Sequence, residues 1–413
     1  MTAEDDLREG KAIRQTLPEL IIHAGTHKTA STYIQERLHR NKTLLLQWGI
    51  DVQDPQLNRP KPKRLVSALC NQRWNEWNNF LKHKNHQHNL LLSAEQFSVP
   101  FTNPECISKF QSIAKSNGYR PHIVIFIRSQ LDYINSRYIY SLRRFYHDQS
   151  FEKFVNDALC GRLFNEKRTR GSITRRQDVF DFWTFFQPLL NAKANGFKVT
   201  FIPFKHHNTD PFDQIIKAIG LSPDLTWTSC ENSYSNKSPG IRGVWMARLL
   251  AHLIKTQSIP VDSIRNSSQI ILKEERRRRW NDPRFWGFSR DLSQRVVAQY
   301  AEHNDHFAQA VWGCSWTSVF NNDAELLQRQ RSVYLPASIS EELRMHAIGS
   351  HLLRRIEHQR HTKPWHVLTE PLASAIDLVL PTLSDQCLRG WESRTSVHAN
   401  RRTPKQPIPP ADG

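Results

Sequence analysis

Residues 20–35 read LIIHAGTHKTASTYIQ, and this stretch decides the fold of the chain. It opens with three apolar residues, as a buried strand does. Gly25 then marks a sharp turn at which bare backbone can approach a ligand closely. Ile34 and Leu38 are apolar and four positions apart, which predicts a helix that begins near Ala30 or Ser31. A strand, a turn and a helix N-terminus together form an anion site, because the free amides and the helix dipole face the ligand.

The turn carries one lysine among small hydroxyl side chains. A nucleoside triphosphate loop, G-x-x-x-x-G-K-[ST], needs a glycine directly before the lysine. Here His27 precedes Lys28, and only two residues separate Gly25 from Lys28. The turn is therefore too short to wrap a β,γ-phosphate pair and suits one phosphate, with the lysine reaching towards a second group. An ordinary strand-to-helix turn with a solvated lysine is the plainer alternative.

A second junction of the same kind follows about a hundred residues later. Residues 122–127, HIVIFI, form the clearest apolar strand in the chain and end at Arg128. Ser129 then starts a helix, with Asp132 placed to support a capping arrangement. Ser136 lies eight positions after Arg128, about two turns into this helix. The apolar stripe of the helix consists of Leu131, Ile134, Tyr138, Leu142 and Phe145.

These two segments resemble the donor-binding motifs of sulfotransferases that use 3′-phosphoadenosine 5′-phosphosulfate (PAPS), in particular the bacterial branch of that family. GTHKTxST followed by Ile-Gln is similar to its 5′-phosphosulfate loop, and strand–Arg128–helix–Ser136 is similar to its 3′-phosphate motif. The resemblance spans about residues 18–316. It implies a three-layer α/β domain of P-loop type with a central, mostly parallel sheet. Ala30 departs from the family, in which a glycine is usual there; a helical Ala30 would tolerate this change without cost.

The resemblance also implies which residues bind the donor. The loop side chains and amides would hold the 5′-phosphosulfate, Lys28 would support the leaving group, and Arg128 with Ser136 would grip the 3′-phosphate. Tyr33 is either an adenine stacker or a core residue. The complete predicted set is Gly25, Thr26, His27, Lys28, Thr29, Ala30, Ser31, Thr32, Tyr33, Arg128 and Ser136.

The base that accepts the proton of the acceptor has two candidates. Glu95 follows the apolar run of residues 90–92, between the two phosphate motifs, where this family often places a Glu or His. Its alternative role is to cap the following helix or to pair with an arginine. His27 is the rival base, and its alternative is a neutral imidazole bonded to backbone. We expect no metal, because the lysine, the amides and the helix end already supply positive charge.

The composition bounds the remaining possibilities. The 413 residues contain 57 Lys and Arg against 39 Asp and Glu, a net charge of +18 that attracts anionic partners. We divide the chain into a flexible arm (1–17), the sulfotransferase-like domain (18–320), a C-terminal helical extension (321–392) and a disordered tail (393–413). In the extension, Ser338 and Glu341 predict a capping box at the start of a helix.

The setting of the protein follows from what the sequence lacks. The six cysteines are scattered, the N-terminus is acidic without a secretory signal, and no continuous apolar run reaches 18 residues. We therefore expect a cytoplasmic protein without a membrane span. The resemblance suggests a glycan or glycolipid hydroxyl as acceptor, less readily an amine, and no nucleic acid. Two alternatives are a P-loop kinase of a small molecule and a catalytically silent, basic polyanion-binding protein. The oligomeric state is not predicted.

Overall fold

A computed structural model defines the fold and describes residues 17–26, 28–53, 62–162, 179–204, 209–230 and 238–361. Its central sheet has five strands in the order β2-β3-β1-β4-β5, and every neighbouring pair is parallel. The strands are β1 (Glu19–His23), β2 (Ile50–Val52), β3 (Asn89–Ser93), β4 (Arg120–Ile127) and β5 (Lys198–Pro203). The predicted α/β fold with a mostly parallel sheet is confirmed.

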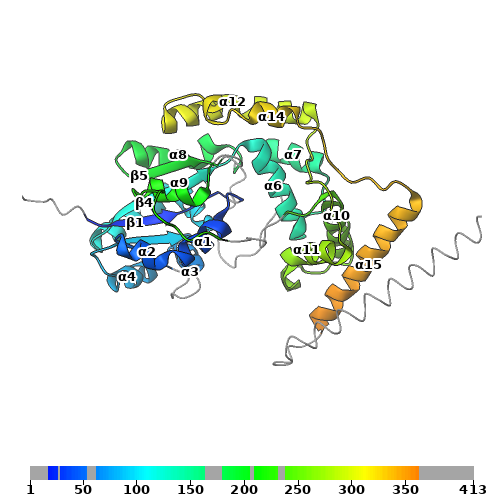
Figure 1. The fold of residues 1–413 in the computed structure, drawn as a ribbon, viewed down its shortest axis with the longest axis horizontal. Helices are drawn as coiled ribbons and strands as arrows, with labels where there is room; N and C mark the ends of the chain where they lie inside the picture. The colour runs from blue at the N-terminus through cyan, green and yellow to red at the C-terminus, as the bar shows by residue number, and fades with distance from the viewer. Residues whose placement is uncertain are drawn as a thin grey trace, which may run out of the picture.

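Two layers of helices cover the sheet, because alternate residues of each strand face opposite sides. In β1, Leu20 and Ile22 join one apolar cluster and Ile21 joins the other. The Ile21 side is covered by α1 (Ser31–Arg40), α2 (Lys42–Gln47) and α9 (Pro211–Ala218). The opposite side is covered by α3 (Pro62–Cys70), α4 (Trp74–Lys82), α5 (Pro104–Ser116) and α8 (Phe182–Ala194). The domain therefore has the three layers expected from the sequence (Figure 1).

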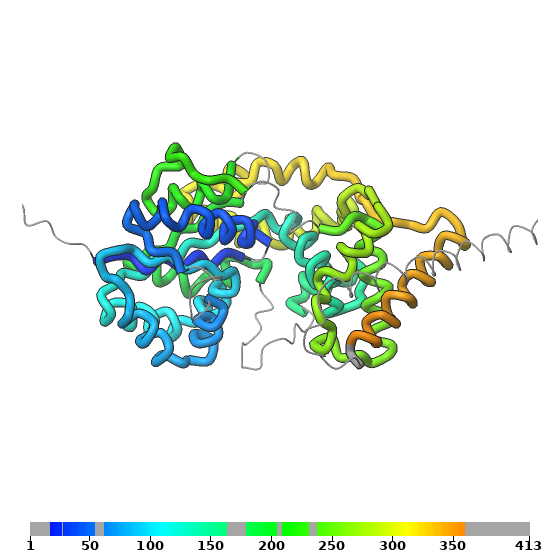
Figure 2. Tube along the Cα trace, turned by 60° about the horizontal axis from the view of Figure 1, so that its bottom comes forward, coloured from blue at the N-terminus to red at the C-terminus, as the bar shows by residue number. Residues whose placement is uncertain are grey.

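A second group of helices lies beside the sheet. It contains α7 (Phe151–Leu159), α10 (Ile241–Thr256), α11 (Ser267–Arg278) and α15 (Ile339–His361). Helix α6 (Gln130–Arg143) runs from the end of β4 towards this group, and α12 (Arg290–Trp312) bridges both parts (Figure 2). Short helices α13 (Trp316–Val319) and α14 (Asp323–Gln328) follow α12. The stripe predicted for α6 is buried along its whole length.

The predicted helical extension is present in the described part of the chain up to residue 361. At the start of α15 the Glu341 amide donates to Ser338 Oγ at 3.2 Å, so that half of the expected capping box is confirmed. Most of the predicted arm, all of the predicted tail and the end of the extension lie outside the described residues. No helix in the described ranges is long and apolar enough to cross a membrane.

The strand order brings the two phosphate motifs and Glu95 to one place. Strand β1 lies between β3 and β4, and the chain builds the sheet outward in opposite directions from this point. Open parallel sheets bind ligands at the carboxyl ends of the strands where the order reverses in this way. The turn after β1, Glu95 after β3 and Arg128 after β4 all leave the sheet at this edge.

Candidate functional site

The turn after β1 is held by β4 and by its own hydroxyl groups. The Ala24 amide donates to the Val124 carbonyl at 2.8 Å, and Thr26 Oγ1 donates to the Phe126 carbonyl at 3.0 Å. Thr29 Oγ1 donates back to the Thr26 carbonyl at 2.7 Å. A Cβ on Gly25 would lie 3.0 Å from Thr29 Oγ1 and 3.1 Å from His23 Nε2, so a side chain there would crowd the turn. The hydrogen bonds fix the turn before any ligand binds.

The backbone of this turn corrects one expectation. Helix α1 begins at Ser31, as predicted, but Ala30 is not helical: its φ of 57° and ψ of 20° place it in the left-handed region. Lys28 also has a positive φ, of 70°. Left-handed backbone disfavours residues with a Cβ, so Ala30 is strained relative to a glycine. The departure from the family pattern at Ala30 therefore has a conformational cost.

Two buried polar atoms face this turn without a partner in the described part of the chain. They are His23 Nε2 and Ser31 Oγ, on side chains that are 0% and 6% exposed. His23 Nε2 lies 3.1 Å, and Ser31 Oγ 3.7 Å, from the point where a Cβ on Gly25 would stand. Buried polar groups are nearly always hydrogen-bonded, and a buried group without a partner costs about 1–3 kcal/mol. This pair next to a helix N-terminus favours a bound oxyanion.

His23 is a site residue that the sequence did not reveal. Its Nδ1 lies 2.8 Å from Ser93 Oγ of the neighbouring strand. Burial lowers the pKa of His23 to about 4, so the ring is neutral near pH 7. When the Ser93 hydroxyl donates to Nδ1, the proton sits on Nε2 and is available to an oxyanion in the turn. The only signal in the sequence was a polar residue at the end of an apolar run.

Arg128 joins the second motif to the first. Its Nη1 donates to the Lys28 carbonyl at 2.9 Å, and Nη2 lies 3.5 Å from Asp132 Oδ1. The side chain is buried, and this burial lowers the pKa of the guanidinium. Ser136 is buried two turns further along α6. Arg128 is therefore held against the turn, while the contact of Ser136 with a ligand stays a prediction.

Lys28 lies at the centre of a charged cluster. Its ammonium is 5.1 Å from the centroid of the Tyr140 ring on α6. The pKa of Lys28 falls to about 8, first because of burial and then because of the positive charge of Arg143. Glu95 acts in the opposite direction and supports the charged form. Burial therefore makes the ammonium ion unfavourable on its own, and a bound anion would stabilise its charged form.

The two candidate bases have different outcomes. Glu95 is the first residue of the short helix η1 (Glu95–Ser98), and it interacts electrostatically with both His23 and Lys28. Its Oε1 also accepts a long hydrogen bond of 3.4 Å from Gln96 Nε2. His27 lies outside the described residues. Glu95 thus stands next to the turn, while its role as a base stays a prediction.

Tyr33 is anchored at its hydroxyl end. The hydroxyl donates to Asp210 Oδ2 at 2.7 Å and accepts from Arg37 Nη1 at 2.7 Å, and burial raises the pKa of Tyr33 to about 12. The partly buried ring packs against the apolar cluster on the α1 side of the sheet. Stacking on an adenine stays a prediction for this residue.

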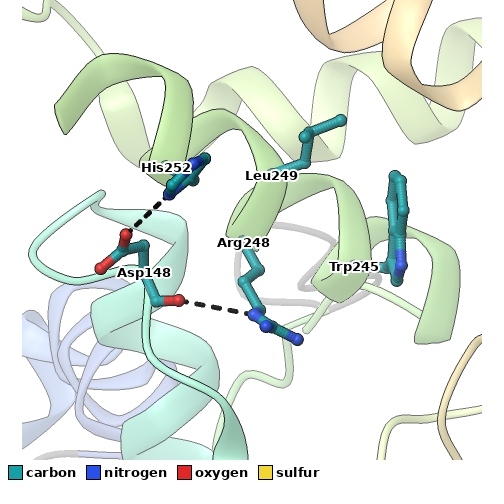
Figure 3. Close-up of a pocket in the computed structure, with 5 residues that line it drawn as sticks. All are labelled: Asp148, Trp245, Arg248, Leu249 and His252. Carbon is teal, nitrogen blue, oxygen red and sulfur yellow. Dashed lines mark hydrogen bonds and ion pairs between the residues drawn. The ribbon is translucent and has the colours of Figure 1, made fainter. Parts of the chain in front are cut away.

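A separate surface pocket of about 280 Å³ lies on α10, away from these residues in the sequence. It is lined by Asp148, Trp245, Arg248, Leu249 and His252 (Figure 3). His252 Nδ1 lies 3.0 Å from Asp148 Oδ2, and Arg248 Nε donates to the Asp148 carbonyl at 3.4 Å. The polar groups are thus already engaged with one another. Within the described ranges, no group of three or more His, Cys, Asp or Glu side chains is arranged so that it could hold a metal ion.

Comparison with known proteins supplies no family for this chain. No family model matches it, and no curated protein matches it. The sulfotransferase resemblance therefore depends on the two motifs and on the geometry around them.

Proposed function

We propose that this protein transfers a sulfuryl group from PAPS to a hydroxyl, or less readily an amine, of an acceptor. The turn between β1 and α1 carries this proposal: two buried groups, His23 Nε2 and Ser31 Oγ, face it unpartnered within the described residues. Arg128, from the second motif, is bonded to the Lys28 carbonyl of the same turn. A ligand with two separate phosphates, one at the turn and one near Arg128, fits this arrangement. PAPS has that chemistry.

The proposed donor contacts divide between the two motifs. The amides at the start of α1, the hydroxyl of Ser31 and the His23 ring would hold the 5′-phosphate. The fork of donors on Arg128 and the hydroxyl of Ser136 would hold the 3′-phosphate. Residues Thr26, Thr29 and Thr32 complete the predicted loop, although Thr26 and Thr29 already use their hydroxyls to shape it.

The proposed reaction needs one proton acceptor and one source of positive charge. The donor supplies an activated sulfuryl group. Glu95 takes the proton from the acceptor hydroxyl as that oxygen bonds to sulfur, and the bond from sulfur to the bridging phosphate oxygen breaks in line. Lys28 neutralises the charge that grows on this oxygen. The products are the sulfated acceptor, adenosine 3′,5′-bisphosphate and a proton carried by Glu95.

A thermal-shift panel tests the donor class. The ligands are adenosine 3′,5′-bisphosphate, ADP, and ATP with Mg²⁺. We expect stabilisation by the 3′,5′-bisphosphate alone, by about 2.7 kcal/mol at a concentration one hundred times its Kd. Stabilisation by ATP with Mg²⁺ alone would instead favour a small-molecule kinase. No response to any of the three would contradict the proposal.

A pair of serine variants locates the bound ligand. Ser31→Ala removes a buried hydroxyl that has no partner among the described residues, so the free protein should melt no lower while the 3′,5′-bisphosphate binds less tightly. Ser293→Ala is the matched control, because its buried hydroxyl donates to the Arg290 carbonyl at 2.7 Å on α12. That variant should melt lower and bind the nucleotide normally. The reverse result would remove Ser31 from the site.

A further inference from the structure

We infer that the acceptor carries an oxyanion of its own, close to the reacting hydroxyl, and that the later turns of α6 bind it. This inference rests on the proposed function, since it concerns the partner that receives the sulfuryl group. It adds a substrate class, an anionic acceptor, and names Arg137, Arg143 and Arg144 as the residues that select it.

Three cationic groups surround one aromatic ring on α6. The ring of Tyr140 has Lys28 Nζ at 5.1 Å, Arg137 Cζ at 5.6 Å and Arg144 Cζ at 5.5 Å from its centroid. Residues 137, 140 and 144 are neighbours on one face of the helix, because side chains three and four positions apart lie together. The face of α6 that reaches the turn after β1 is therefore strongly basic.

These arginines lie beyond the part of α6 that the donor requires. Arg128 precedes the helix and Ser136 stands in its second turn, so the 3′-phosphate contacts end there. Tyr140 is one turn further on, and the Lys28 ammonium reaches it. Lys28 is where the sulfuryl group leaves the donor. An acceptor that reaches Lys28 from the side opposite the 3′-phosphate therefore passes the later turns of α6.

The far side of this cluster is also built from charged groups held in place. Arg143 is 6% exposed, and it interacts electrostatically with Lys28 and with Glu275 of α11. Glu275 Oε1 in turn accepts the Gly240 amide at 2.8 Å, which ties α11 to the start of α10. Arg143 thus lies within electrostatic range of a carboxylate on a neighbouring helix. Helices α10 and α11 both belong to the second group of helices, which packs beside α6 (Figure 2).

Arg144 gives the clearest sign that a ligand belongs here. Its Nε is buried and has no hydrogen-bond partner in the described part of the protein. An arginine fork binds carboxylate and sulfate groups through paired N–H donors, more strongly than it binds neutral oxygens. A neutral acceptor would leave the Nε–H of Arg144 without a strong hydrogen bond. An oxyanion would accept that hydrogen bond and offset the repulsion among the cations. The oxyanion can be a carboxylate or a sulfate ester, which share this chemistry.

A matched set of oligosaccharides tests the inference. The set is a hexasaccharide that contains uronic acids, the same chain with its carboxyl groups reduced to alcohols, and the reduced chain bearing sulfate esters. Binding is measured by calorimetry on the full chain saturated with adenosine 3′,5′-bisphosphate. We expect at least one anionic chain to bind about ten-fold or more tighter than the neutral chain. The better of the two anionic chains identifies which oxyanion the site prefers.

Two charge-removing variants make the test specific. Arg144→Gln should abolish most of the preference for the anionic chains and leave the affinity for the 3′,5′-bisphosphate within about three-fold. Arg120→Gln, at the opposite end of β4, removes the same charge and should change neither. Equal binding of all three chains, including no binding of any, would overturn the inference, as would loss of nucleotide binding in Arg144→Gln. A wild-type chain that fails to bind the nucleotide would instead contradict the proposed function.

Discussion

The two ends of the central sheet carry the same four kinds of ionisable side chain, arranged in opposite ways. The amino end has Glu19, Arg120, His122 and Lys198, and the carboxyl end has His23, Lys28, Glu95 and Arg128. At the amino end the groups bind one another. At the carboxyl end they face a turn that also holds unpartnered buried atoms of described residues. Composition alone therefore does not distinguish a structural cluster from a binding site.

The amino-end cluster is a closed network. Glu19 binds Lys198 Nζ at 2.6 Å and His122 Nδ1 at 3.0 Å, and His122 Nε2 is 2.9 Å from Thr200 Oγ1. The His122 hydrogen bond is the main reason that the pKa of Glu19 falls to about 2. Both ring nitrogens of His122 thus have partners, whereas among the described residues His23 has a partner at only one. The two ends therefore differ in whether their buried hydrogen-bonding groups have partners, and a ligand is expected at the carboxyl end.

The largest expected effect separates the two glutamates. Glu95→Gln keeps size and polarity but cannot accept a proton, so turnover with the acceptor should fall about 10²–10⁴-fold while PAPS affinity stays within a few-fold. Glu19→Gln should leave turnover unchanged and lower the stability by about 1.5–3 kcal/mol, because it weakens charged hydrogen bonds. Steady-state kinetics and chemical denaturation measure the two effects. Normal turnover in Glu95→Gln would leave Glu95 with a structural role, and His27 would be the next residue to test.

The two arginines should differ in nucleotide recognition. Arg128→Ala should weaken binding of adenosine 3′,5′-bisphosphate by roughly 2–3 kcal/mol, because a charge-assisted pair with the 3′-phosphate is lost. Binding of 5′-AMP, which has no 3′-phosphate, should change much less. Arg120→Ala, at the other end of the same strand, should alter neither affinity. Calorimetry checks all six values, and equal losses for both nucleotides in Arg128→Ala would remove Arg128 from this role.

The lysines should differ in pH dependence. Lys28 has a pKa of about 8 in the free protein, so its charged form is present below pH 8 and is lost above it. The affinity for the 3′,5′-bisphosphate should therefore fall up to about ten-fold per pH unit above that point, since the phosphates themselves titrate near pH 6. Lys28→Arg should remove this decline, because arginine stays charged.

The control for this pH profile is Lys198→Arg, which should keep the decline because Lys198 belongs to the amino-end cluster. Affinity measured from pH 7 to 9.5 decides the matter. A profile that is flat in the wild-type protein would show that the Lys28 charge does not support binding.

The histidines give the most direct test of hydrogen-bond saturation. His23→Ala should weaken the 3′,5′-bisphosphate by about 1 kcal/mol, the value of one hydrogen bond, and His122→Ala should not weaken it. His122→Ala should destabilise the protein more than His23→Ala does, because it leaves both Glu19 and Thr200 without their hydrogen-bond partner. Thermal melts with and without nucleotide measure both effects. A loss of nucleotide affinity in His122→Ala alone would reverse the assignment of the two ends.

Much of the fold and part of the site could be predicted because their signals are local. An apolar run that ends in a turn residue and continues with helical spacing marks β1, β4 and their helices, and Arg128 and Glu95 follow directly from strand ends. The three-residue strand β2 is too short to show a pattern of its own and depends on β3 for its pairing. His23, and the meeting of Lys28 with the α6 arginines, depend on tertiary packing. Residues far apart in the chain meet there, and no local pattern predicts it.

The smallest change is expected at Ala30, which precedes α1 and is not helical. Its backbone is left-handed, and in this conformation the Cβ of an alanine crowds the neighbouring backbone, whereas a glycine has no Cβ. Ala30→Gly should relax this strain by about 1–2 kcal/mol, but glycine also loses more entropy on folding, so the net gain in stability should be a few tenths of a kcal/mol up to about 1 kcal/mol. The control is Ala114→Gly in the buried interior of α5, where the same change should destabilise because helical backbone needs no glycine. Denaturant titration of both variants measures the difference. If Ala30→Gly destabilises as Ala114→Gly does, the turn adopts a helical backbone at residue 30, and the strain argued for the carboxyl end of the sheet is absent.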